Sequence, residues 1–170
     1  LSLIGGMVAA AVVTGNSIVC KPSSDSPIVA YKFVELCEKA GIPAGVVNYI
    51  PGSGSDIGDY IVEHPLTRFI NFTGSKAIGC RINEHAAKIS KGQKWIKRVV
   101  AEMGGKNAII VDSSANIKKA AQGIANSAFT FQGQKCSACS RAIVMSDVYD
   151  ELVDAVVEEA KKLKADQGAG

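Results

Sequence analysis

Short apolar runs alternate with amphipathic stretches of helical period along all 170 residues of this chain. Residues 17–20, 46–50 and 68–72 are apolar runs of a length that suits strands buried on both faces. Between them, residues 26–40 and 76–88 carry the helical pattern. Strands that alternate with helices form parallel sheets, so the sequence predicts an α/β fold with a doubly wound parallel sheet.

The same pattern predicts the remaining elements. A helix is expected over residues 3–13 with a stop at Gly15, and Ser26 followed by Pro27 predicts a serine-capped helix start. A second set of strands and helices begins after Glu102. The other expected elements are a short helix reaching residue 63, strands over 96–101, 108–111 and 142–145, and helices over 116–130 and 148–164.

Charge and cysteine content narrow the classes of function. The net charge is +3 and the basic residues are scattered, so we expect no nucleic-acid partner. Five cysteines without paired spacing predict a reducing compartment, which is the cytoplasm or, in a eukaryote, the mitochondrial matrix. The apolar run over residues 1–13 is shorter than a bilayer span, so we expect a buried helix and no membrane partner.

Cys136 is the candidate nucleophile. It follows an amphipathic stretch and stands among small and polar residues beside Lys135, a setting that can favour an exposed thiolate. Glu102 is the candidate base, since it ends an apolar strand and precedes the pair Gly104-Gly105. A solvated surface glutamate is the ordinary alternative.

Two glycine-containing turns are candidate phosphate-binding segments. Gly52, Gly54 and Gly58 form a pattern one residue longer than the dinucleotide fingerprint, and a plain tight turn uses such residues more often. In Phe72-Thr73-Gly74-Ser75 a strand ends where a helix begins, and such a helix start binds anions. Ser75 would cap this helix in either case, so the residues alone favour neither an anion site nor a simple helix cap.

Other polar residues have ordinary explanations. Cys139 completes a C-x-x-C pair with Cys136, but one pair without nearby histidines is too few ligands for zinc, so Cys139 is expected to be a packing residue and no metal is expected. His64 and His85 are expected to be structural or solvent-facing. Lys21 opens the segment Lys21-Pro22-Ser23-Ser24 after the first strand, where an exposed loop lysine is the commoner case.

Residues 131–141 around Cys136 and the string Glu-Met-Gly-Gly-Lys from Glu102 resemble the two signature motifs of the aldehyde dehydrogenase superfamily. The resemblance implies that Cys136 forms a thiohemiacetal with an aldehyde, that hydride passes to NAD or NADP, and that Glu102 activates the hydrolytic water. It also implies a cofactor site. The residues assigned to that site are Lys21, Pro22, Ser23, Ser24, Gly54, Phe72, Thr73, Gly74, Ser75 and Gly104.

The resemblance also implies a division of the chain and a substrate class. Residues 1–105 are expected to be part of a Rossmann-like NAD(P)-binding domain, and residues 106–170 the start of an α/β catalytic domain. The stretches 68–75, 92–98 and 131–141 resemble the branch that oxidises glutamate γ-semialdehyde to glutamate in proline and arginine breakdown. In that branch Ser137 would contact the substrate's α-carboxylate. Ser24 stands where strictly NAD-using relatives often carry an acid, which leaves NADP open.

Two alternatives stay open. One is another semialdehyde dehydrogenase of the same superfamily, and the other is a cofactor-binding fragment without turnover. The chain is expected to be an internal piece of a protein roughly three times as long, far above the usual size of one domain, and such a piece could be inactive alone. The complete protein is expected to be a homo-oligomer with a small-molecule aldehyde as its substrate.

Overall fold

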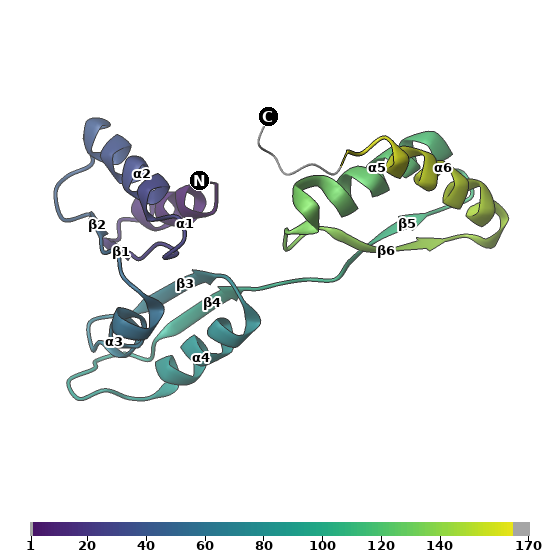
Figure 1. The fold of residues 1–170 in the computed structure, drawn as a ribbon. Coiled ribbons are helices and arrows are strands. Elements are labelled where there is room, and N and C mark those ends of the chain that lie inside the picture. Colours follow the sequence, from purple (N-terminus) through teal and green to yellow (C-terminus); the bar gives the residue numbers. More distant parts are fainter. Residues whose placement is uncertain (1, 165–170) are drawn as a thin grey trace. The chain divides into compact units, whose positions relative to one another are not determined.

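The computed structural model describes residues 2–164 (Figure 1). These residues divide into two compact units, 2–102 and 103–164. Every strand pair is parallel and is bridged by at least one helix, which confirms the predicted α/β class. Within the described residues the strands form three separate ladders of two strands each. Each ladder is therefore one βαβ unit, and within the described residues the three units do not join into a single sheet.

The first unit contains two of these ladders. α1 (Ser2–Val13) precedes β1 (Ile18–Cys20), which pairs with β2 (Val47–Tyr49) across α2 (Pro27–Lys39). β3 (Phe69–Thr73) pairs with β4 (Arg98–Glu102) across α4 (Lys76–Ala87). Between the ladders lie a π-helical turn, η1 (Gly54–Gly58), and the short helix α3 (Asp59–Glu63).

The second unit is one ladder covered by two helices. β5 (Asn107–Val111) pairs with β6 (Cys139–Val144), and α5 (Ile117–Phe129), η2 (Thr130–Gly133), η3 (Ser146–Val148) and α6 (Tyr149–Lys161) complete the unit (Figure 1). Its core is the cluster Val111, Ala121, Ile124 and Leu152, so β5, α5 and α6 share one buried apolar face. Strand β6 begins three residues before the expected position because Asn107 already pairs with Cys139.

Most helix ends follow the predicted signals, with one exception. Gly15 has φ of +80°, and the Ser75 hydroxyl caps α4 by accepting a hydrogen bond from the Ile78 amide at 3.4 Å. Ser26 does stand before α2, but the prediction that its side chain caps the helix is wrong. Its backbone lies at φ −142° and ψ 47°, outside the extended conformation that lets a cap side chain reach the first turn.

The carboxyl end of α3 is held by donors from four separate places. The Tyr60 carbonyl accepts from the His64 amide, and the Ile61 carbonyl accepts from the Thr67 hydroxyl at 2.7 Å. The Val62 carbonyl accepts from Lys97 Nζ at 2.6 Å. The last carbonyl, on Glu63, accepts from the Ser90 hydroxyl at 2.6 Å. The His64 carbonyl at the helix cap accepts from the Thr67 amide at 3.0 Å. The carbonyls that this helix end leaves without helical partners are therefore satisfied, which explains how five residues can hold a helix.

Lys97 is the unexpected member of this set. The residue is only 7 % exposed, and burial lowers the pKa of its ammonium below the ordinary value.

No helix within residues 2–164 has both the length and the hydrophobicity that a membrane crossing requires.

Replacing Lys97 with methionine should loosen α3, because the substitution keeps the apolar stem but leaves the Val62 carbonyl buried without a donor. We expect a loss of about 1–3 kcal/mol of local opening free energy. Hydrogen–deuterium exchange on peptides spanning 59–67 of the complete polypeptide measures it. Lys94→Met, at an exposed loop position, is the matched control. Equal exchange in both variants would contradict the capping role.

Candidate active site

The candidate nucleophile Cys136 lies on the loop between η2 and β6, and its side chain is exposed and free. The backbone before it is unusual. Phe131 and Gln132 have φ of +58° and +54°, and Gly133 follows at +68°. Left-handed conformations cost free energy in residues with side chains and cluster at functional sites. A Cβ at Gly133 would lie 2.8 Å from the Ala128 carbonyl oxygen, so only glycine fits there.

The glycine pair of the Glu102 motif meets this loop. A Cβ at Gly105 would lie 2.7 Å from the Cys136 carbonyl oxygen, whereas one at Gly104 would meet nothing within 4 Å. Gly105 is thus required by the close approach of the cysteine loop. The structure gives Gly104, which was assigned to the cofactor site, no steric reason to be glycine.

Glu102 is the last residue of β4, where it pairs with Thr73 at the end of β3. Its carbonyl accepts a hydrogen bond from the Gly74 amide at 3.0 Å. The parallel register therefore brings the candidate base beside the candidate phosphate segment. The Glu102 side chain is exposed and makes no hydrogen bond within the described residues, so nothing in the first unit encloses the carboxylate.

The start of α4 has the features of an anion site. Ser75 accepts from the Ile78 amide, and the amides of Lys76 and Ala77 have no acceptor inside the helix. Thr73 donates to Met7 Sδ at 3.6 Å, and the ring of Phe72 lies over Gly74, where an added Cβ would be 2.5 Å from Cζ. Twelve residues of helix stand behind these amides, so the dipole favours a negative group here.

Lys21 joins the ends of β1 and β2. Its Nζ donates to the Pro22 carbonyl at 2.9 Å and to the Gly52 carbonyl at 3.2 Å. Pro22 is buried, whereas Ser23 and Ser24 are exposed. The four residues therefore line the carboxyl end of the first ladder, where ligands bind in open parallel sheets.

In the glycine pattern that exceeds the fingerprint by one residue, Gly54 begins and Gly58 ends the π-helical turn η1, and Gly52 precedes it. A π turn accommodates one residue more than an α turn, which accounts for the extra residue between Gly54 and Gly58. Ser53 caps this turn by accepting from the Asp56 amide at 3.1 Å, and Gly54 has open space around its Cα. Gly54 is thus free to approach a ligand closely.

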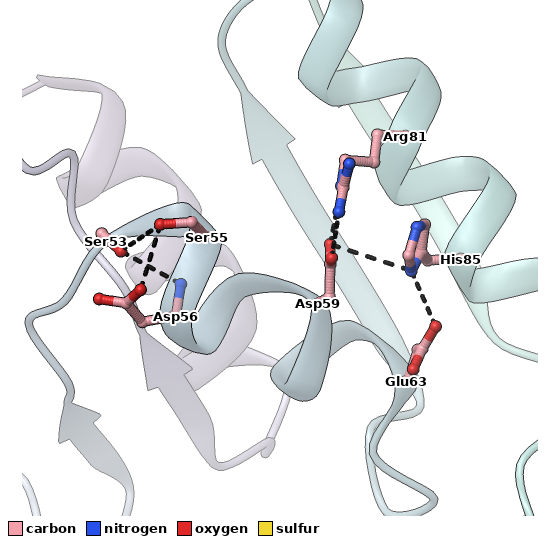
Figure 2. A network of polar contacts seen from close by, with 7 residues as sticks. All are labelled: Ser53, Ser55, Asp56, Asp59, Glu63, Arg81 and His85. Atoms are coloured by element: carbon pink, nitrogen blue, oxygen red, sulfur yellow. Dashed lines mark hydrogen bonds and ion pairs between the residues drawn. The ribbon is translucent and has the colours of Figure 1, made fainter.

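A polar network that was not predicted links α3 to α4 (Figure 2). Arg81 donates to both oxygens of Asp59, and His85 Nδ1 lies 2.8 Å from Glu63 Oε1. His85 Nδ1 is also 3.9 Å from Asp59 Oδ1. Each helix supplies its pair at a spacing of four residues, so each pair lies on one helix face. The spacing of four within each helix can be seen in the sequence, but the sequence does not show that these two helices pack against each other.

The remaining cysteine and histidine predictions can be placed. Cys139 is 9 % exposed and opens β6, in agreement with a packing role. His64 follows the last residue of α3, where its Nδ1 accepts from the Leu66 amide at 3.3 Å.

Residues 2–164 hold no group of three or more metal-binding side chains. Ser137 is exposed beside Cys136. Since Cys136 and Glu102 belong to different units, their convergence remains a prediction.

Replacing Arg81 with methionine should raise the pKa of Asp59, because hydrogen bonds from Arg81 are the main cause that lowers it below 3.8. In the parent, stability from Asp59 is present above its unfolded pKa and is lost as the pH falls through the lowered pKa. A carbon-13 NMR titration of the Asp59 carboxyl in the complete polypeptide measures the shift. Arg68→Met, which removes a cation 5.7 Å from the Trp95 ring, is the control. An unmoved Asp59 pKa in Arg81→Met would refute the pairing.

The chain is similar to a known protein family and to named proteins. Residues 1–169 match the model of the aldehyde dehydrogenase family. A protein of Geobacillus thermodenitrificans named 1-pyrroline-5-carboxylate dehydrogenase is 60% identical over 162 residues, which cover 95% of this chain and 32% of that protein. A protein of the same name from Anoxybacillus flavithermus is 59% identical over 163 residues, or 96% of this chain and 32% of that protein.

Solved structures give the same result. A 1-pyrroline-5-carboxylate dehydrogenase from Thermus, crystallised with bound NAD, matches with a TM-score of 0.88 and 46% identity over 95% of this chain and 31% of that chain. Proline utilization A from Bdellovibrio bacteriovorus matches with a TM-score of 0.90 and 49% identity over 96% of this chain and 17% of that one. The chain spans about a third of the length of these curated relatives. Because the family model covers nearly every residue, the chain belongs to the aldehyde dehydrogenase family.

Proposed function

We propose that the protein carrying this chain oxidises L-glutamate γ-semialdehyde, the open form of 1-pyrroline-5-carboxylate, to L-glutamate with NAD. The observation that carries the proposal is 60% identity, over 95% of this chain, to a relative named for that substrate. The exposed thiol of Cys136, on a loop held against the Gly105 backbone, supplies a nucleophile of the required kind. This reaction belongs to the breakdown of proline and arginine.

The residues of the first unit fit a dinucleotide. The amides at the start of α4, with Thr73, Gly74 and Ser75, suit a pyrophosphate, and Gly54 leaves room for close approach. Lys21 to Ser24, at the end of β1, would face the adenosine ribose, with no acidic residue at Ser24 to exclude a 2′-phosphate. When bound, the nicotinamide accepts hydride. The relative from Thermus was crystallised with NAD, which supports NAD as the cofactor here.

The chain's own residues divide the chemistry between them. The Cys136 thiolate attacks the aldehyde carbon and forms a thiohemiacetal, and loss of hydride from that carbon leaves a thioester. Glu102 takes a proton from a water molecule that attacks the thioester, and the carboxylate product and the free thiol are released. Ser137, next to the thiol, would donate a hydrogen bond to the α-carboxylate of the substrate.

The two units would then have separate tasks. The first unit, which carries the cofactor-binding segments, would be part of the NAD-binding domain, and the second would begin the catalytic domain. The expected setting is the cytoplasm, because the relatives are bacterial proteins and the five cysteines lack paired spacing. We further propose that the complete protein is a homo-oligomer.

Replacing Cys136 with alanine should abolish aldehyde oxidation in the complete protein, because no other group forms the thioester. Binding of NAD, followed by calorimetry, should stay intact. Cys80→Ala removes another exposed free thiol and should keep the parent rate. Parent activity in Cys136→Ala would reject the nucleophile.

The parent should also show a higher kcat/KM for glutamate γ-semialdehyde than for succinate semialdehyde, and the reverse order would reject the substrate.

Replacing Glu102 with glutamine should leave the acylation step and slow the hydrolysis of the thioester. Loss of a general base typically costs about 10²–10⁴-fold in rate. Stopped-flow absorbance of NADH should therefore show a burst of about one equivalent followed by a slow steady state. The control is Glu38→Gln, an exposed helical glutamate of the same unit. A steady-state rate equal to the parent's would remove Glu102 from this role.

A further inference from the structure

The carbonyl of Cys136 is held by a side chain that no motif assigned. Asn107 Nδ2 donates to this oxygen at 3.3 Å. The same oxygen is the atom that a Cβ at Gly105 would meet at 2.7 Å, and Asn107 Oδ1 would lie 3.0 Å from that Cβ. Gly105 and Asn107 therefore enclose one peptide group, the one that joins Cys136 to Ser137.

The strands around this contact fix both of its ends. Asn107 opens β5 and pairs with Cys139, but the next residue, Ala108, pairs with Arg141. Ser140 is thus an extra residue, and such a bulge redirects the chain next to it. The residue before Asn107 is also held, because its carbonyl, that of Lys106, accepts a hydrogen bond from Arg141 Nη2 at 3.2 Å. The start of β5 and the start of β6 are locked together by side chains as well as by the ladder.

A third contact anchors the loop to α5. The Cys139 amide donates to the Ser127 hydroxyl at 3.1 Å, and both Ala138 and Cys139 are buried. Residues 135–138, between this anchor and the left-handed segment 131–133, form a turn in which the Ala138 amide donates to the Lys135 carbonyl at 3.2 Å. Inside that turn, the described structure holds Cys136 itself only through its carbonyl.

We infer that Asn107 is a positioning residue for the nucleophile. Its amide sets the plane of the peptide that follows Cys136, and with it the direction in which the Cα–Cβ bond carries the thiol. Within the described residues no hydrogen bond joins Asn107 to the thiol, so the residue acts through the backbone carbonyl that it holds. The inference rests on the proposed role of Cys136 and adds a residue to it.

The test measures how fast iodoacetamide alkylates Cys136 relative to Cys80 in the same complete polypeptide, by mass spectrometry of the two peptides. Cys80 is exposed and lies in the first unit, so it serves as an internal reference. In Asn107→Ala the ratio and kcat should both fall roughly five- to tenfold, the size expected for one lost hydrogen bond. The KM for NAD should not change.

Two further variants and a control sharpen the result. Asn107→Asp replaces the donor with a carboxylate that repels the carbonyl oxygen, so its ratio should fall below that of Asn107→Ala. Gly105→Ala should also lower the ratio, because its Cβ displaces the same oxygen. The control is Ser113→Ala, which loses a bond of 2.8 Å to Asp147 after β5, at the opposite end of the ladder, and should match the parent.

The outcomes separate the two proposals. An unchanged or raised ratio in Asn107→Ala, with Cys136→Ala inactive, would overturn the positioning role alone. Turnover in Cys136→Ala would instead overturn the proposed function. Faster labelling of both cysteines in Asn107→Ala would mean general loosening of the fold and would likewise overturn the positioning role.

Discussion

Parallel pairing across a helix is the constraint on which the arrangement of the first unit depends. When a chain leaves a strand, forms a helix and returns to a parallel strand, both strands end at the same edge. The register of β3 and β4 consequently places Thr73 opposite Glu102, and the Gly74 amide bonds to the Glu102 carbonyl. Two motifs that are far apart in sequence thus meet through their backbones.

The second unit uses the opposite edge of its ladder. Gly105 and Asn107 precede or open β5, and the Cys136 loop leads into β6, so the contact between them lies at the amino-terminal ends of the strands. This edge lacks the helix starts that bind anions at a carboxyl edge. It has instead a close backbone approach and a bulge, which suit the placement of a nucleophile better than the binding of a phosphate.

Local signals were sufficient for much of the fold and of the candidate site. Apolar runs located every strand to within a few residues, and Ser75 stands at the predicted helix cap, since a cap depends on only three or four neighbouring residues. The same kind of signal misled at Ser26, where the backbone is not extended. It could not indicate that Lys97 is buried, because the carbonyl that accepts its hydrogen bond lies 35 residues away on α3.

The sequence by itself determined the class of fold, the family and the residue types at the candidate site, because alternating periodicity and short motifs are properties of consecutive residues. Only the tertiary structure decided which of those residues meet. It joined Asn107 and Gly105 to the Cys136 carbonyl, joined Arg81 to Asp59, and left the Glu102 side chain exposed at the end of β4. Such contacts depend on register and on the packing of distant elements, which no local pattern encodes.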